Sequence, residues 1–161
     1  ARELPDVTFV VNGGGSARPS LEADAAGLAN VRFGDFQPAE RLREVLATAD
    51  IHVVPLKAGL GRVSVPSKTY SILASGRPIL AAVDAGTEVP RILDASGAGV
   101  AVLPDRADLF VVALRELLDD RAGLERRGAA GRTWVEGHVS PAAVAEQYEA
   151  LFRGLGQPGA V

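Results

Sequence analysis

The chain has 161 residues, of which 47% are hydrophobic and 23% charged, with a formal net charge of −3 at pH 7. This length fits one domain with an adequate core, and the charge balance excludes a strongly basic nucleic-acid-binding protein. No apolar run approaches the ~18–20 residues that cross a bilayer, and the N-terminal residues do not resemble a secretion signal. Cysteine is absent, which excludes disulfides and thiolate metal sites.

Strand-like and helix-like patterns alternate along the chain. Short runs rich in β-branched and other apolar residues predict strands over 7–11, 31–33, 51–56, 78–83 and 99–103. Helical spacing, prolines and capping residues predict helices over 21–28, 38–50, 66–74, 88–93, 106–118, 121–135 and 141–152. The alternation predicts the α/β class: a Rossmann-like, doubly wound parallel sheet with helices on both faces.

In such folds, ligands bind beyond the carboxyl ends of the strands. Three turns are expected at that edge: Gly13–Arg18, Lys57–Ser67 and Val83–Glu88. They hold most of the glycines that have no obvious capping duty. We therefore expect any ligand site to be built from these three turns.

The first of these turns contains Gly13, Gly14 and Gly15, followed by Arg18. A glycine turn lets a ligand approach the backbone, and the arginine can pair with phosphate. The alternative is a tight turn with a solvated arginine. The turn lacks the GxGxxG pattern with a later acidic residue, so it does not predict a dinucleotide site.

The most informative stretch is Ile51–Ala82, which reads as strand, glycine-rich loop, helix, glycine turn and strand. Its loop and helix start carry Lys57, Arg62 and Lys68, with Ser64 and Ser67 as candidate caps. The alternative is a solvated surface loop. A lysine in the first helical turn opposes the helix dipole unless an anion is bound, which favours anion binding.

The remaining polar candidates have simpler explanations. Thr87 and Glu88 match a helix cap and a first-turn acid, although the carboxylate could also accept hydrogen bonds from sugar hydroxyls. His52 is expected to be a core histidine and His138 a surface one. On the late helices, Trp134 and Tyr148 are expected to pack. No residue pattern supports a nucleophilic triad or a zinc site.

These residues together resemble the C-terminal, nucleotide-sugar-binding half of a GT-B glycosyltransferase, of the retaining group called family 4. The resemblance rests on four landmarks in order: VTFVVNGGGSARPSLEADAAGLANVRFGDF, LREVLATADIHVVPL, SKTYSILASGRPILAAVDAGTEVPRIL and the late helices. The run PLKAGLGRVSVPSK resembles the branch of colanic-acid and O-antigen sugar transferases.

The resemblance implies a function and its site. Such a domain binds the nucleotide-diphosphate sugar, the donor substrate, from which the enzyme transfers the sugar to a carbohydrate or lipid-linked acceptor during cell-surface polysaccharide synthesis. It needs no cofactor and no metal. The implied diphosphate contacts are Gly13, Gly14, Gly15, Arg18, Lys57 and Lys68. The implied contacts to base, ribose and sugar are Asp35, Phe36, Ser64, Ser67, Ser71 and Glu88. No catalytic residue is assigned.

The chain also departs from the family pattern. Many members carry two glutamates eight residues apart, at positions that correspond here to Val63 and Ser71. Methionine is absent from the chain. By the resemblance, the family's first strand and helix are expected to precede Ala1, and they carry a further diphosphate-binding lysine. The acceptor-binding domain is expected to precede Ala1 as well. We therefore expect an incomplete domain over 1–154, a loose tail over 155–161, no transferase activity of the chain alone, and self-association through exposed strand edges.

The expected location is cytoplasmic, with peripheral attachment to the inner membrane face as an alternative for the complete protein. Two other functions stay open. A nucleotide-sugar epimerase of the same plan would need acid and base residues around its cleft, and only Glu88 and the two histidines are available. A non-catalytic receiver-like module would need acidic residues after the first strand, where the chain has Asn12 and three glycines.

Overall fold

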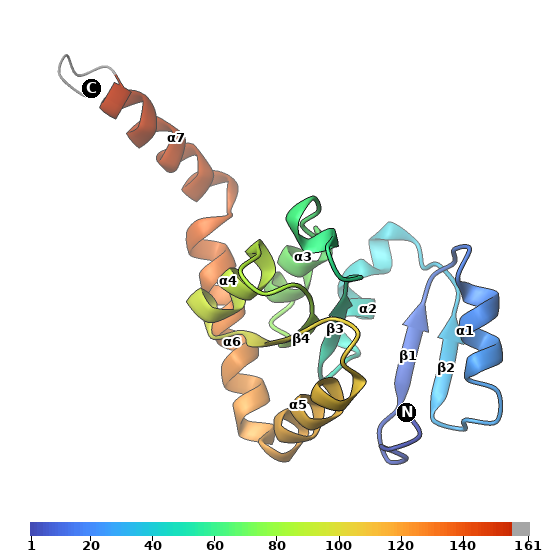
Figure 1. Ribbon diagram of the computed structural model, residues 1–161. Helices are drawn as coiled ribbons and strands as arrows, with labels where there is room; N and C mark the ends of the chain where they lie inside the picture. Colours follow the sequence, from blue (N-terminus) through green and yellow to red (C-terminus); the bar gives the residue numbers. More distant parts are fainter. Residues whose placement is uncertain (156–161) are drawn as a thin grey trace. The chain divides into compact units, whose positions relative to one another are not determined.

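The computed structural model describes residues 1–155, in which strands and helices alternate as the sequence predicts (Figure 1). The strands are β1 (Phe9–Asn12), β2 (Val31–Gly34), β3 (His52–Pro55), β4 (Ile79–Ala82) and β5 (Gly99–Val102). The α-helices are α1 (Arg18–Asp24), α2 (Leu42–Ala47), α3 (Lys68–Ala74), α4 (Glu88–Ser96), α5 (Ala107–Asp119), α6 (Arg121–His138) and α7 (Pro141–Leu155). Two 3₁₀ helices are η1 (Ala39–Arg41) and η2 (Leu60–Arg62).

All strand pairings are parallel, which confirms the α/β class. Backbone pairing distributes the strands over two sheets, β1–β2 and β3–β4–β5. The chain likewise divides into two compact units, Ala1–Val45 and Leu46–Val161. We call them unit 1 and unit 2 and describe each by itself.

In unit 1, β1 and β2 pair from Phe9 opposite Val31 to Asn12 opposite Gly34. The connecting helix α1 begins and ends earlier than the predicted helix 21–28. Pro19 fits the first helical turn, where no backbone N–H is needed, and the left-handed Gly27, with a φ of 81°, stops the helix from continuing.

In unit 2, successive residues of the central strand β4 face opposite sides of the sheet. Ile79 and Ala81 belong to the main core cluster, which also contains Leu73 of α3 and Leu93 of α4. Leu80 is buried as well but lies outside that cluster, and α5 contacts β4. Helices therefore cover both faces of this sheet, as predicted.

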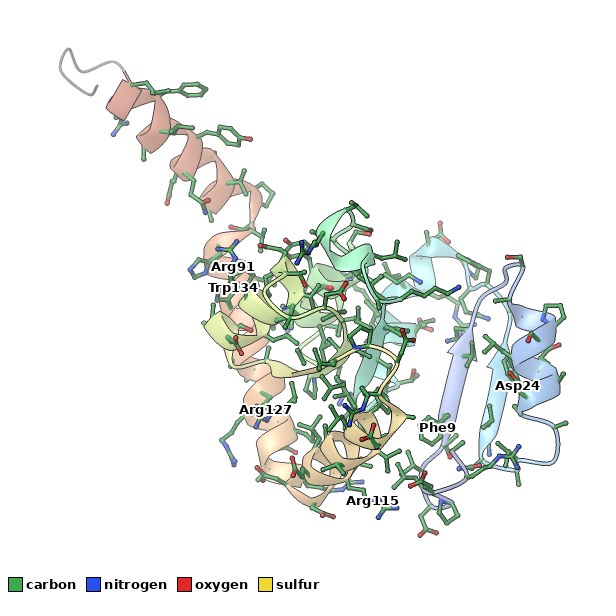
Figure 2. All side chains as sticks on the ribbon, viewed as in Figure 1. Phe9, Asp24, Arg91, Arg115, Arg127 and Trp134 are labelled. Atoms are coloured by element: carbon green, nitrogen blue, oxygen red, sulfur yellow. The ribbon has the colours of Figure 1, made fainter. Side chains whose placement is uncertain are left out.

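The last helices differ in how they pack. α6 contacts α3, α4 and α5, whereas α7 has no buried residue among those described. Tyr148 of α7 is 58% exposed and stacks on Phe152, so the packing predicted for it is confined to a neighbour on the same helix. Figure 2 shows side chains projecting from α7 on several sides. The helix continues through Leu155, and the rest of the predicted tail, 156–161, lies outside the described residues.

Within residues 1–155, we find no helix that has both the length and the hydropathy needed to span a bilayer.

Candidate functional site

The first predicted turn lies at the carboxyl end of the β1–β2 sheet. Gly13 adopts a φ of 115°, a conformation that favours glycine, and its N–H donates to the Gly34 carbonyl at 3.0 Å. Arg18, at the start of α1, donates from Nη1 to the carbonyl oxygens of Gly13 (2.9 Å) and Gly34 (3.3 Å). The arginine therefore ties the ends of both strands together.

The guanidinium of Arg18 also makes two ion pairs, with Glu22 at 2.7 Å and Asp35 at 3.0 Å. These acceptors raise the pKa of Arg18 above its ordinary value, with the Glu22 hydrogen bond as the largest cause. Its charge is thus shared with two carboxylates, a structural role that the sequence did not suggest.

Phe36 lies beside the same turn. Its ring is close to Gly13, because a Cβ built on that glycine would lie 3.4 Å from Phe36 Cε2, and the residue is 83% exposed. The structure thus brings Gly13, Arg18, Asp35 and Phe36 together at one end of unit 1. An exposed aromatic ring beside a glycine turn and a carboxylate has the chemistry to receive a nucleotide base.

The second and third turns meet in unit 2. The loop after β3 contains η2, and Asp84, just after β4, accepts hydrogen bonds from the backbone N–H groups of Gly59 and Gly61. Two of the turns predicted to share the carboxyl edge are therefore in direct contact.

The cations and serines of this region lie on the surface. Lys57, Arg62, Lys68 and Ser71 are exposed, and within residues 1–155 neither lysine makes a salt bridge. This placement leaves both ammonium groups free to meet an anion.

The predicted caps are not made by the expected side chains. Ser67 occupies the position before α3, yet its hydroxyl makes no capping hydrogen bond, and the helix begins at Lys68 rather than at Pro66. Ser64 lies in the loop after η2, where its backbone N–H donates to Leu60. Thr87 precedes α4 but donates to the Asp84 carbonyl at 2.6 Å instead of accepting from the helix.

Glu88 opens α4 and forms an ion pair with Arg91, one turn later, at 2.7 Å. Arg91 is labelled in Figure 2. A carboxylate compensated in this way keeps acceptor capacity for a hydroxyl.

His52 is half-buried and lies outside the core that was predicted for it, whereas His138 lies on the surface as predicted. His52 Nε2 is 2.8 Å from the Leu46 carbonyl, and burial lowers the pKa of its imidazole. His138 is exposed and stacks on Trp134, which packs against the core. The described residues contain no group of three or more His, Asp or Glu side chains arranged to hold a metal ion.

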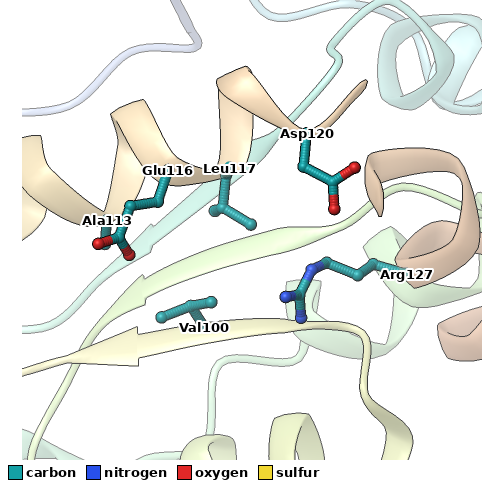
Figure 3. A pocket seen from close by; sticks show the side chains of 6 residues that line it. All are labelled: Val100, Ala113, Glu116, Leu117, Asp120 and Arg127. Atoms are coloured by element: carbon teal, nitrogen blue, oxygen red, sulfur yellow. The ribbon is translucent and has the colours of Figure 1, made fainter. Parts of the chain in front are cut away.

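A small cavity of about 70 Å³ lies between β5, α5 and α6 (Figure 3). It is lined by Val100, Ala113, Glu116, Leu117, Asp120 and Arg127. The end of α5 and the start of α6 bring it to the amino ends of the strands, and none of the predicted site residues lines it. In parallel α/β folds the ligand edge is the opposite one.

The parallel sheets with helices on their faces define a Rossmann-like α/β domain. Two solved structures share the fold. Sucrose-phosphate synthase from Thermosynechococcus elongatus aligns over 91% of this chain and 38% of its own, with a TM-score of 0.73 and 22% identity. WaaG, a glycosyltransferase involved in lipopolysaccharide biosynthesis, aligns over 84% of this chain and 37% of its own, with a TM-score of 0.64 and 18% identity.

The chain belongs to the family "Glycosyl transferases group 1", whose model matches residues 1–120. It is 31% identical over 129 residues to the probable glycosyltransferase WbjE of Pseudomonas aeruginosa, covering 79% of this chain and 31% of that protein. It is 32% identical over 119 residues to WcaI of Escherichia coli, a putative colanic acid biosynthesis glycosyl transferase, covering 73% and 29%. The chain therefore spans about a third of the length of these relatives, and the predicted family is confirmed.

Proposed function

We propose that this chain is the donor-binding part of a glycosyltransferase that moves a sugar from a nucleotide-diphosphate sugar to a carbohydrate or lipid-linked acceptor in cell-surface polysaccharide synthesis. The family match and the names of WbjE and WcaI support the reaction class. The observation that supports donor binding is a pair of exposed lysines at the carboxyl edge of the unit 2 sheet, Lys57 and Lys68, which make no salt bridge with any residue of 1–155. The proposed location is the cytoplasm.

In this function, the chain's own residues act mainly through electrostatics. Sugar transfer leaves negative charge on the departing diphosphate, and cations aimed at developing charge lower the barrier. Lys57 and Lys68 would supply that charge, and Ser64, Ser67, Ser71 and Glu88 would accept or donate hydrogen bonds to hydroxyls. In unit 1, the glycine turn and Arg18 would face phosphate, with Asp35 and Phe36 at the base. Acceptor binding would need residues outside this chain.

Replacing Lys68 by alanine tests this proposal. A hydrogen bond to a charged group contributes about 1.5–3 kcal/mol, so we expect affinity for UDP-glucose or GDP-mannose to fall by roughly 10- to 150-fold. Isothermal titration calorimetry of the chain with both sugars and with UDP and GDP measures the change. The matched control is Arg121→Ala, which removes one positive charge at the start of α6.

Unchanged affinity in Lys68→Ala would remove Lys68 from the site. Absence of binding by the unsubstituted chain to any of these four compounds would contradict donor binding. An equal loss in Arg121→Ala would show that net charge, rather than a local contact, governs affinity.

We also propose that the chain associates with itself through sheet edges. Among residues 1–155, β3 pairs only with β4. The N–H groups of His52 and Leu56 donate to the carbonyls of Pro78 and Ala82, on the side of β4. Because successive N–H groups of a strand point to opposite sides, the Val53 N–H points to the open edge. We expect concentration-dependent association by light scattering and a shift towards monomer in Val53→Pro, which removes that donor. A wild-type chain that stays monomeric at all concentrations would contradict this.

A further inference from the structure

Asp84 lies where the strand β4 gives way to the turn before α4, and its carboxylate bonds entirely to another part of the chain. The Gly59 N–H donates to both of its oxygens, at 3.0 Å to Oδ1 and 2.8 Å to Oδ2. The Gly61 N–H donates to Oδ2 at 3.1 Å. One side chain thus fixes two backbone positions that lie more than twenty residues earlier in the sequence.

Local geometry leaves little freedom in this contact. Gly59 adopts a φ of 85°, and Gly61 is buried in a tight space between two side chains. A Cβ on Gly61 would lie 3.1 Å from Thr87 and 3.2 Å from Asp84 Oδ2. Thr87 in turn donates to the Asp84 carbonyl. The backbone on both sides of the carboxylate is therefore held.

The segment that Asp84 holds is the one that carries the cations. Gly59 and Gly61 lie between Lys57 and Arg62, and the same loop leads directly to Lys68 at the start of α3. A positively charged loop of this kind would otherwise be a mobile surface excursion with few apolar contacts. Ordering it before a ligand arrives reduces the entropy that binding must overcome.

We infer that Asp84 is the positioning residue of the donor site: it preorganises the Lys57–Ser67 loop so that its cations meet the diphosphate. This inference rests on the proposed function. In this role Asp84 acts through the loop, whose backbone N–H groups its two oxygens hold, rather than through a contact of its own to the donor.

The carboxylate is ionised at neutral pH. The hydrogen bonds from Gly59 and Gly61 lower the pKa of Asp84 below its ordinary value of 3.8, with a smaller contribution from the charge of Arg62. Because the pKa of Asp84 is lower in the folded chain than its ordinary value, the ionised carboxylate stabilises the folded state fully above pH 3.8. This stabilisation is lost as the pH falls through the folded-state pKa.

The test combines two measurements on the 161-residue chain and on Asp84→Asn, Asp84→Ala and a control, Asp94→Asn, which removes the same charge from an exposed position of α4. The first is NMR: in the wild type, the Gly59 and Gly61 amide signals should titrate in acid with Asp84, and this titration should vanish in Asp84→Asn. Amide hydrogen exchange at both glycines should accelerate at least tenfold in Asp84→Ala.

The second measurement is the affinity for UDP-glucose and GDP-mannose. The phosphate charge of these compounds stays constant between about pH 3 and 7, because phosphate diesters are strong acids and only a terminal phosphate has a pKa near 6. We expect at least a tenfold loss in Asp84→Ala, a smaller loss in Asp84→Asn, which keeps one acceptor oxygen, and no change in Asp94→Asn. Wild-type affinity should also fall as the pH falls through the folded-state pKa of Asp84, which lies below 3.8, and this part of the acid dependence should be absent in Asp84→Asn.

The outcomes separate the inference from the function on which it rests. If the Gly59 and Gly61 amides do not titrate in the wild type and do not exchange faster in Asp84→Ala, Asp84 does not hold the loop. That result would overturn the inference whatever the chain binds. If NMR confirms that Asp84 holds the loop but donor affinity is undiminished in Asp84→Ala, the positioning role is overturned. A wild-type chain that shows the amide titration but binds neither sugar overturns the proposed function, and the donor-positioning role with it.

Discussion

Replacing Gly128 by alanine should destabilise unit 2 by about 3 kcal/mol, the upper end of the usual cost of overpacking. A Cβ at this position of α6 would lie 2.1 Å from the Gly76 carbonyl oxygen and 2.8 Å from its carbonyl carbon. Both are backbone atoms, so no side-chain rotation can relieve the clash. Gly76 is itself constrained, since it follows α3 with a φ of 72°. Urea unfolding followed by circular dichroism measures the loss.

The same helix supplies the control. A Cβ on Gly137 would have no atom within 4 Å. Gly137→Ala should therefore stabilise the chain by about 0.5–1 kcal/mol, the usual gain of alanine over glycine inside a helix. If the two alanine variants unfolded at the same urea concentration, the close contact between α6 and the turn after α3 would be wrong.

Replacing Leu73 by alanine should cost about 2–5 kcal/mol, because the side chain is fully buried and the surrounding backbone cannot collapse into the space it leaves. Leu73 lies in the main core cluster between α3 and the sheet. It also anchors the short helix that begins with Lys68. We therefore expect donor affinity to fall together with stability in this variant.

Leu151→Ala is the matched control, since it removes the same atoms from a position of α7 that is 55% exposed. Its stability should stay within about 0.5 kcal/mol of wild type. A large loss in Leu151→Ala would show that α7 packs more tightly than its exposure indicates. Unchanged stability in Leu73→Ala would contradict the core position of α3.

The elements of the fold could be predicted from local patterns. The strand β4 is one example, because a short apolar run next to a glycine turn has few other interpretations. The helix α6 is another, because apolar residues recur at helical spacing over a long segment. The predicted helix 38–50 is less accurate: the structure has η1 and then a shorter α2. The packing predicted for Tyr148 is limited to Phe152 of the same helix, since an apolar stripe on a helix does not reveal whether another element covers it.

The sequence predicts a site built from three turns at one sheet edge, chosen because their cations, glycines and serines suit phosphate and sugar binding. The structure places the second and third turns on the β3–β4–β5 sheet and the first on the separate β1–β2 sheet. Two contacts were not predictable. The pairing of Arg18 with Asp35, and the bonding of Asp84 to Gly59 and Gly61, join residues that only the folded chain brings together. An aspartate directly after a strand, facing a glycine-rich loop, was the available signal for the second.

The sequence by itself determined the α/β class, the family and the candidate anion-binding residues, because apolar periodicity, glycine turns and motif order are local properties of the chain. Only the tertiary structure decided which of those residues have partners. Within residues 1–155, Lys57 and Lys68 make no salt bridge while Arg18 pairs with the distant Asp35, and Asp84, which local pattern assigns to a simple turn, holds the loop between the lysines. Hydrogen bonds and ion pairs depend on distances across the fold, and those distances are set by packing rather than by neighbours in sequence.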